Sequence, residues 1–227
     1  GGRVLAKAIE SLNLDPDRTT AVLRQGEPKD VVCRVAEELN TDLIIMGSRG
    51  LKRLVSILEN SVSQYVFQLS SSPMLLVKDE IYVRKINRVM VAIDHSAASR
   101  QALKLALLLT RDIKGGQLTL VHVDSDAKRG EKTGADAEKE PSLAVAAAEA
   151  KKAGVAYCSI LASGKAGEVL CRLAEDTKAD LLMLGSPDRR PSIAKGLPDL
   201  DRLLGASLSD YVRVYANCPV LLTRMAA

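Results

Sequence analysis

The strongest constraint on the fold of this chain is that one segment of its sequence occurs twice. Residues 26–37, GEPKDVVCRVAE, are matched by residues 164–175, GKAGEVLCRLAE. Residues 41–48, TDLIIMGS, are matched by residues 179–186, ADLLMLGS, at the same spacing of 138 positions (185 − 47). One supersecondary unit has therefore been duplicated, and the two halves of the chain should share an architecture.

The two copies differ in the loop that follows the repeated strand. The first copy continues through residues 47–50, GSRG, and reaches residues 60–63, NSVS, nine residues later. The second copy carries three prolines within residues 187–198 before residues 206–209, ASLS, where the spacing has grown to 146 positions (207 − 61). The second loop is therefore longer by eight residues (146 − 138).

Length and composition favour two small α/β domains. The chain has 227 residues, and the duplication divides it into residues 1–82 and 83–227. Apolar residues make up 47% and charged residues 26%, as in a soluble globular protein. Aromatic residues are only 3%, so the cores must be built from Leu, Val, Ile and Ala, which suits helices packed on buried parallel strands.

Composition also argues against two classes of partner. The net charge is +4, the Lys and Arg residues are dispersed, and few aromatic rings could stack on bases, so we expect no nucleic-acid partner. No run approaches the roughly 18 apolar residues of a membrane span, so we expect no membrane partner. The four cysteines lack CxxC spacing, and we interpret them as buried structural thiols in the reducing cytoplasm: Cys33, Cys158, Cys171 and Cys218.

The second half alternates short apolar runs with segments of helical period. We expect strands over 88–93, 118–123, 155–161, 181–184 and 220–223. We expect helices from residue 96 to the glycines at 115–116, and over 142–153, 167–176 and 210–215. Residues 124–140 are charged and without period, which predicts a loop. Strands joined by helical crossovers predict a flavodoxin-like, doubly wound parallel sheet of five strands.

The first half carries only the later part of that plan. We expect helices over 4–12, 28–39 and 61–69, and strands over 19–23, 43–46 and 74–77. The counterpart of residues 88–123 is missing, which would leave the first sheet incomplete and its central edges unpaired. We therefore expect about fifty residues to precede Gly1, with another element filling the gap as the alternative.

The first loop has the composition of a phosphate-binding loop. Gly47 and Gly50 permit close approach of the backbone to an anion, and the following helix N-terminus supplies N–H donors. Asn60 tolerates a positive φ, and Ser61 can donate a hydrogen bond or cap the helix. Steric demands of a strand-to-helix loop explain two glycines as well, so the motif alone leaves both interpretations open.

Further motifs give the pattern a specific likeness. The first copy has Gly-x-x-Gly, then nine residues, then a segment like Gly-Ser-Val-Ser. The last strand of the chain begins Cys-Pro-Val-Leu-Leu. Residues 93–96, IDHS, and the strand that ends His122-Val123 belong to the same pattern. This pattern resembles a tandem member of the universal stress protein family. The resemblance implies a fold like that of adenine nucleotide α-hydrolases and a cytoplasmic dimer acting in stress survival. It also implies bound ATP or ADP, with or without Mg²⁺, and little or no hydrolysis.

The resemblance also assigns candidate residues by position. In ATP-binding members the aspartate after the first strand holds the adenosine, and the glycine motif with its serine holds the phosphates. For the first copy it implies a nucleotide site formed by Met46, Gly47, Arg49, Gly50, Asn60, Ser61, Val62 and Ser63. Asn60 stands where the family has glycine, and the aspartate of this site would precede Gly1.

The second copy supplies weaker candidates for the same site, namely Asp94, Val123, Gly185 and Ser207. It lacks the second glycine, has Ala206 in place of the third, and carries prolines, which remove N–H donors that a phosphate needs. We therefore expect the second copy to be degenerate.

Single polar residues near these motifs have structural explanations as well. Asp94 could hold a ribose, cap the helix that starts near Ser96, or do both. His122 on a buried strand is expected to be a satisfied core histidine, whereas His95 lies in a loop where it could approach a ligand. The sequence shows no paired carboxylates, metal-ligand spacing or nucleophile elbow, so we expect neither catalytic residues nor a metal site.

The leading hypothesis is a nucleotide-responsive binding module for stress response or signalling, with one ATP or ADP site in the first copy. The second copy would serve dimerisation or regulation, and the last strands, 74–77 and 220–223, would pair either with each other inside the chain or between two chains. Two alternatives remain: an ATP-hydrolysing enzyme of the same fold, and a cytosolic regulatory domain of a membrane transporter.

Overall fold

A computed structural model describes residues 1–48, 62–78, 81–83, 85–125, 130–186 and 207–224. Its elements in the first repeat are α1 (Gly2–Ser11), η1 (Pro16–Arg18), α2 (Pro28–Glu38), β1 (Ile44–Ser48), α3 (Val62–Leu69) and β2 (Met74–Lys78). Those in the second repeat are β3 (Arg88–Ala92), α4 (Ala97–Arg111), β4 (Gln117–Asp124), β5 (Glu131–Thr133), η3 (Gly134–Lys139), α5 (Pro141–Lys152), β6 (Tyr157–Ser163), α6 (Ala166–Asp176), β7 (Leu181–Gly185), α8 (Leu208–Tyr215) and β8 (Val220–Thr223).

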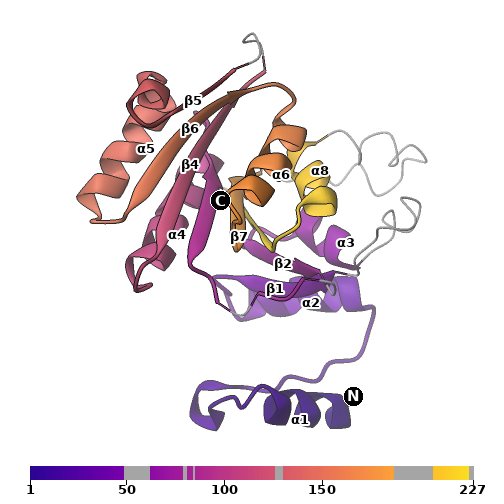
Figure 1. The fold of residues 1–227 in the computed structure, drawn as a ribbon. Coiled ribbons are helices and arrows are strands. Elements are labelled where there is room, and N and C mark those ends of the chain that lie inside the picture. The colour runs from indigo at the N-terminus through magenta and orange to yellow at the C-terminus, as the bar shows by residue number, and fades with distance from the viewer. Residues whose placement is uncertain (49–61, 79–80, 84, 126–129, 187–206, 225–227) are drawn as a thin grey trace, which may run out of the picture.

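All the described strands belong to one sheet, in the order β1-β2-β8-β7-β3-β4-β6-β5 (Figure 1). In the second repeat β8, β7, β3, β4 and β6 run parallel to one another, which confirms the predicted five-stranded doubly wound sheet. Chain order reverses between β3 and β7, because β3 leads outward to β4 whereas β7 leads outward to β8. This pair of strands is the topological switch point, where sheets of this kind bind their ligands.

The two repeats are joined by antiparallel pairing of their last strands. Met74 of β2 faces Leu222 of β8, and Leu76 faces Val220. Of the two arrangements expected for these strands, the structure shows the one inside the chain. Because β2 and β8 cover each other's edges, neither presents an open edge at this junction.

Side chains also cross the junction between the repeats. The Lys78 ammonium, at the end of β2, donates to the carbonyl oxygens of Val214 and Ala216, each at 2.6 Å. Arg224, just after β8, donates to the carbonyl oxygen of Phe67, and its guanidinium carbon lies 4.5 Å from the centre of the Phe67 ring. Each repeat therefore sends a cation to the end of a helix that belongs to the other.

The core lies on both faces of the sheet. Buried side chains of α2, α3, α6 and α8 form one hydrophobic cluster, and those of α4 and α5 form the other. Residues 181–184 of β7 are buried throughout, as expected for a central parallel strand that is covered on both faces. Helices therefore pack on both faces of buried parallel strands, as the aliphatic composition predicts.

The first repeat lacks part of this packing. Residues 19–23, predicted to form a strand, pair with no described strand, because the described residues supply no counterpart of β4, the strand that pairs with β6 in the second repeat. Helix α1 buries no side chain, whereas its repeat counterpart α5 buries several against β4 and β6. A cavity of about 650 Å³ lies between α1 and the layer of α2 and β1, and Figure 1 shows α1 apart from the rest of the fold.

The predicted loop over 124–140 was wrong for its second half. There β5 pairs antiparallel with β6, and η3 follows it. The sequence is charged, but Ala137 is fully buried and Ser159 donates to the Glu138 carboxylate at 2.9 Å, which holds η3 against the sheet. These contacts depend on β6, so the local sequence does not reveal them.

The cysteines were also predicted incompletely. Cys218 is buried and Cys33 and Cys171 are half-buried, but Cys158 is exposed. Cys158 lies on β6, where its neighbour Ser159 points into the core, so alternation along the strand turns the Cys158 thiol outward. The expectation of four buried thiols therefore fails at Cys158.

Candidate functional site

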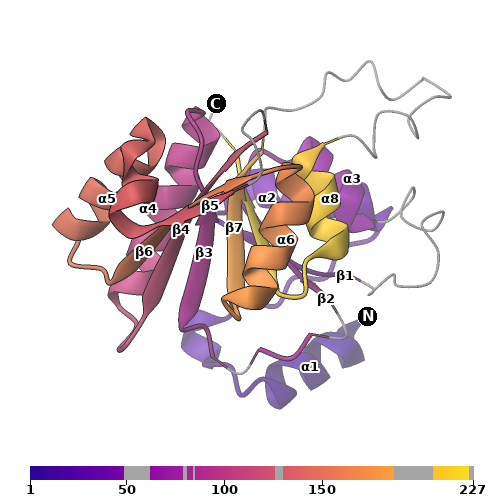
Figure 2. The ribbon, with the colours of Figure 1, turned by 45° about the horizontal axis from the view of Figure 1, so that its top comes forward.

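The candidate site in the second repeat lies at the carboxyl ends of β3 and β7. Figure 2 shows these two strands side by side at the centre of the sheet, with α6 and α8 on the near side. Helix α4 begins just after β3, and Ser186, just after β7, donates to Ser209 in the first turn of α8 at 3.3 Å. Two helix N-termini therefore face the switch point, where their N–H groups and dipoles favour an anion.

Asp94 organises the turn that leads from β3 into α4. Its side chain is exposed, and Oδ1 accepts the Ser96 N–H at 2.7 Å. Its own backbone N–H donates to Ser99 Oγ at 2.9 Å, while Ser96 Oγ accepts the Ser99 N–H at 3.0 Å as the N-cap of α4. The expected structural role of this turn is confirmed, whereas ribose binding by Asp94 stays a prediction.

Gly185, at the end of β7, is covered by the first turn of α4. A Cβ atom added to it would lie 2.4 Å from the Ser99 nitrogen and 2.6 Å from the Ala98 carbonyl carbon. Thr223 reinforces this contact, because its Oγ1 donates to the Ala98 carbonyl oxygen at 2.8 Å. Packing alone therefore requires glycine at position 185.

Gly47 is the counterpart of Gly185 at the end of β1, and its surroundings are different. No heavy atom of the described residues lies within 4 Å of a Cβ added at Gly47. The residue is exposed, while Met46 beside it is half-buried. The described residues contain no counterpart of α4, the helix that covers Gly185, so nothing among them packs against Gly47 from that side.

The start of α8 differs from the start of α3 in charge. Ser207 caps α8: its Oγ accepts the Asp210 N–H at 3.2 Å and donates to the Asp210 carboxylate at 2.6 Å. Ser209 in the same turn accepts a hydrogen bond from Ser186 at 3.3 Å. A buried carboxylate thus occupies the first turn of α8, where it would repel a phosphate. The equivalent residue of α3 is the neutral, buried Gln64 (210 − 146).

Asp210 has a buried cationic partner. An Arg213 nitrogen lies 3.6 Å from the Asp210 carboxylate, and both side chains are nearly inaccessible to solvent. Burial lowers the pKa of the Arg213 guanidinium, and the charge of Asp210 opposes that effect only in part. The carboxylate is therefore held in the core by a partner rather than offered to a ligand.

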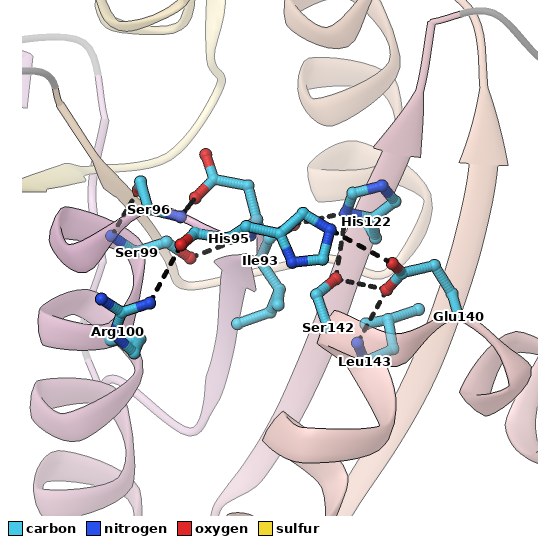
Figure 3. Close-up of polar contacts among 10 residues, drawn as sticks. Ile93, His95, Ser96, Ser99, Arg100, His122, Glu140, Ser142 and Leu143 are labelled. Carbon is cyan, nitrogen blue, oxygen red and sulfur yellow. Dashed lines mark hydrogen bonds and ion pairs between the residues drawn. The ribbon is translucent and has the colours of Figure 1, made fainter.

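A second polar cluster lies on the α5 side of β3 and β4 (Figure 3). His122 on β4 places Nδ1 2.8 Å from the Ile93 carbonyl oxygen, so this nitrogen carries the proton, and 3.3 Å from Ser142 Oγ. The Ser142 hydroxyl donates a hydrogen bond to the Glu140 carboxylate. His122 is half-buried and hydrogen-bonded, which agrees with the expected satisfied core histidine. Ser142 lies between the imidazole and the carboxylate, whereas nucleophilic catalysis needs the histidine in that place.

Glu140 is the centre of this cluster, and the sequence analysis did not single it out. Its Oε2 accepts the Leu143 N–H at 2.8 Å and thereby caps α5, and its Oε1 lies 3.8 Å from Nε2 of the exposed His95. Burial raises the pKa of Glu140, but the hydrogen bonds from Ser142 and Leu143 and the charge of His122 lower it below the ordinary value. Glutamate is an uncommon N-cap, so only the following Pro141 could have signalled this role.

The structure thus places some of the predicted site residues and not others. Met46 and Gly47 lie at the end of β1, and Val62 and Ser63 begin α3. Four others lie outside the described residues: Arg49, Gly50, Asn60 and Ser61. In the second repeat Asp94 and Gly185 meet the same turn of α4, Ser207 caps α8, and Val123 is half-buried near the end of the adjacent β4.

Among the described residues, no three or more His, Cys, Asp or Glu side chains are grouped so that they could bind a metal ion. Over the same part of the chain, no helix combines the length and the apolar character that crossing a bilayer requires.

Comparison with known proteins gives the same family in both repeats. The model of the universal stress protein family matches residues 3–78 and again residues 85–224. Universal stress protein Sll1654 of Synechocystis is 41% identical over 59 residues, which cover 26% of this chain and 38% of that protein. Universal stress protein YxiE of Bacillus subtilis is 33% identical over 78 residues, covering 34% and 53%. The chain therefore spans between about a third and a half of these relatives' lengths.

Solved structures show the same fold. A universal stress protein from Archaeoglobus fulgidus superposes with a TM-score of 0.75 and 24% identity, over 99% of this chain and 74% of that one. A second structure, from Pseudomonas aeruginosa, superposes with a TM-score of 0.57 and 12% identity, over 98% and 78%. The two matches of the family model cover nearly the whole chain, so it belongs to the universal stress protein family as a tandem member.

Proposed function

We propose that this protein is an adenine-nucleotide-binding module of stress response or signalling, with one ATP or ADP site in the first repeat. The site would be formed by the end of β1, the loop after it and the start of α3. The second repeat would no longer bind nucleotide and would support the first through the shared sheet. Membership of the universal stress protein family supports this function, because its ATP-binding members carry a similar glycine motif, with glycine in place of Asn60.

The observation that carries the proposal is the contrast between the two equivalent glycines. Gly185 is explained by the first turn of α4, which leaves no room for a Cβ. Gly47 has open space on its Cα, because the described residues contain no counterpart of α4, so its backbone is open to a ligand from that side. A phosphate that approaches this backbone would be excluded by a larger side chain.

Charge at the two helix N-termini supports the same assignment. The first turn of α8 contains the Asp210 carboxylate, which opposes a phosphate, whereas the first turn of α3 contains neutral Gln64. A negative charge near a helix N-terminus is stabilised by about 0.3–1 kcal/mol through the helix dipole. A carboxylate that already lies there, such as that of Asp210, competes with a phosphate for this stabilisation. The first repeat therefore offers the better anion site.

We propose binding without turnover. The described polar cluster with a serine and a histidine has the wrong order for a nucleophile and base, and Ser142 is buried. A signalling role in the cytoplasm would suit the unreactive thiols, since burial raises the pKa of Cys218 to about 12 and that of Cys171 to about 11. Pairing of β2 with β8 would take the place that last-strand pairing has in a homodimer.

The test is calorimetric titration of ATP and of ADP into the protein, with and without Mg²⁺. We expect the unmodified protein to bind and Gly47→Val to weaken binding at least about tenfold, a loss of about 1.4 kcal/mol, without lowering thermal stability. Gly50→Pro should act in the same direction by removing an N–H donor. Ser207→Ala, in the second repeat, is the matched control and should leave affinity unchanged. No nucleotide binding, or equal affinity in Gly47→Val, would show that the first-repeat site is wrong.

A further inference from the structure

Lys78 and Arg224 are equivalent residues of the two repeats. They are 146 positions apart (224 − 78), the same spacing that relates the starts of α3 and α8. Both lie at the carboxyl ends of the last strands, and both direct their charge into the opposite repeat. The symmetry of these contacts follows from the duplication, so it is a property of the junction rather than of one side chain.

The antiparallel pairing of β2 and β8 explains why each cation reaches a helix end. Pairing of Met74 with Leu222 sets the carboxyl end of each strand beside the amino end of the other. Helix α3 ends shortly before β2, and α8 ends shortly before β8. The last carbonyl groups of a helix lack partners within the helix and carry the negative end of its dipole, so they attract cationic donors.

The two helices that receive these cations are equivalent: α3 follows β1 in the chain, and α8 follows β7. Each has eight residues, so its two ends are roughly 12 Å apart. A contact that fixes the carboxyl end of so short a helix also restrains its amino end. We propose that Arg224 and Lys78 are reciprocal positioning residues that act from the opposite repeat: Arg224 holds α3, whose N-terminus belongs to the proposed nucleotide site, and Lys78 holds α8, the counterpart of α3 in the second repeat. As regards ligand affinity, this inference rests on the proposed function.

The contact of Arg224 is the more specific of the two. Arg224 is 6% exposed, and its guanidinium both donates to the Phe67 carbonyl and lies over the Phe67 ring. The residue equivalent to Phe67 in α8 is Arg213 (213 − 146), which gives Lys78 no aromatic ring to cover. Lys78 instead joins two carbonyl oxygens of α8 and the segment after it. Removal of Arg224 leaves the buried carbonyl of Phe67 without that partner, and removal of Lys78 does the same to two partly buried carbonyls, which is costly.

Hydrogen–deuterium exchange of the whole chain, read by peptide mass spectrometry, tests the crossed arrangement directly. Arg224→Met should speed exchange in α3 by about 5–30-fold and leave α8 nearly unchanged, whereas Lys78→Met should do the reverse. Arg224→Lys and Lys78→Arg retain a cationic donor and should keep most of the protection. These conservative variants keep the test informative if a methionine variant fails to fold. If Arg224→Lys or Lys78→Arg exchanges fast in both α3 and α8, the proposal is overturned.

ATP titration of the same variants tests the link to the site. Arg224→Met should weaken ATP binding at least about fivefold, and Lys78→Met should leave it close to the unmodified value, because the proposed site uses α3. Equal loosening of both helices by both variants, or unchanged ATP affinity in Arg224→Met, overturns the proposal. If the unmodified protein binds no ATP, the proposed function fails, while the exchange pattern still decides whether the cations hold the helices crosswise.

Discussion

The sharpest structural prediction concerns Gly185, because its neighbours are backbone atoms that cannot move alone. In Gly185→Ala, the new Cβ would lie 2.4 Å from the Ser99 nitrogen, whereas ordinary contacts begin at 3.4 Å. The first turn of α4 must therefore shift by about 1 Å, or β7 must bend away from it. Either movement also strains the hydrogen bond from Thr223 to the Ala98 carbonyl.

The size of the effect follows from these two contacts. Overpacking of a core costs about 1–3 kcal/mol, and a weakened hydrogen bond adds about 0.5–1.5 kcal/mol. We therefore expect Gly185→Ala to lower the free energy of unfolding by about 2–4 kcal/mol, which for a chain of this size lowers Tm by roughly 5–15 °C. Gly47→Ala is the matched control, because the same Cβ meets no described atom there.

The assay is urea unfolding followed by far-ultraviolet circular dichroism, with the midpoint and the slope fitted separately for each variant. Gly185→Ala should shift the midpoint at an unchanged slope, and Gly47→Ala should change the free energy of unfolding by no more than about 1 kcal/mol. If the two alanine variants unfold at the same urea concentration, Gly185 is not explained by packing, and the contrast between the two repeats loses its basis.

Two other predictions concern titration. The pKa of Glu140 is lowered in the folded protein, so its contribution to stability is present above its ordinary pKa of 4.5 and is lost as the pH falls through the folded value. Glu140→Gln should therefore be less stable than the unmodified protein at about pH 6, with the difference shrinking towards pH 3 in urea titrations; a constant difference would contradict this. For thiol labelling with a disulfide reagent near pH 8, Cys158 should react first. Cys171 and Cys218 should react last, because burial raises their pKa values, and fast labelling of Cys218 would show that the core opens there.

Local pattern was enough to predict the five parallel strands of the second repeat and the helices between them. Its strands are apolar runs separated by helix-period segments, and the duplication gave an internal check on each of them. The same pattern failed for residues 19–23, because a strand needs a neighbour and hydrophobicity does not show whether one is present. It failed again for residues 131–139, where pairing with β6 and burial of Ala137 override a charged local sequence.

The candidate site was only partly predictable for a related reason. Gly47, Asp94 and Gly185 could be identified because they match family motifs at strand ends, where sheets of this kind bind their ligands. Their difference in surroundings depends on how α4 lies against β7, which no local pattern contains. The cations at the repeat junction were missed because their partners are far away in sequence, up to 157 positions for Arg224 and Phe67. Glu140 was missed because glutamate is an uncommon N-cap.

The pairing of β2 with β8 inside one polypeptide has a consequence for how such a protein can change. In a symmetric pair of identical chains, every substitution occurs in both partners, so a loop cannot be lost from one side alone. Here the two faces of the junction are encoded separately, and a covalent connection keeps their effective concentration high at any dilution. One half can therefore acquire prolines and a buried Asp210–Arg213 pair while the other keeps its glycines. The pairing of β2 with β8 is retained throughout such changes.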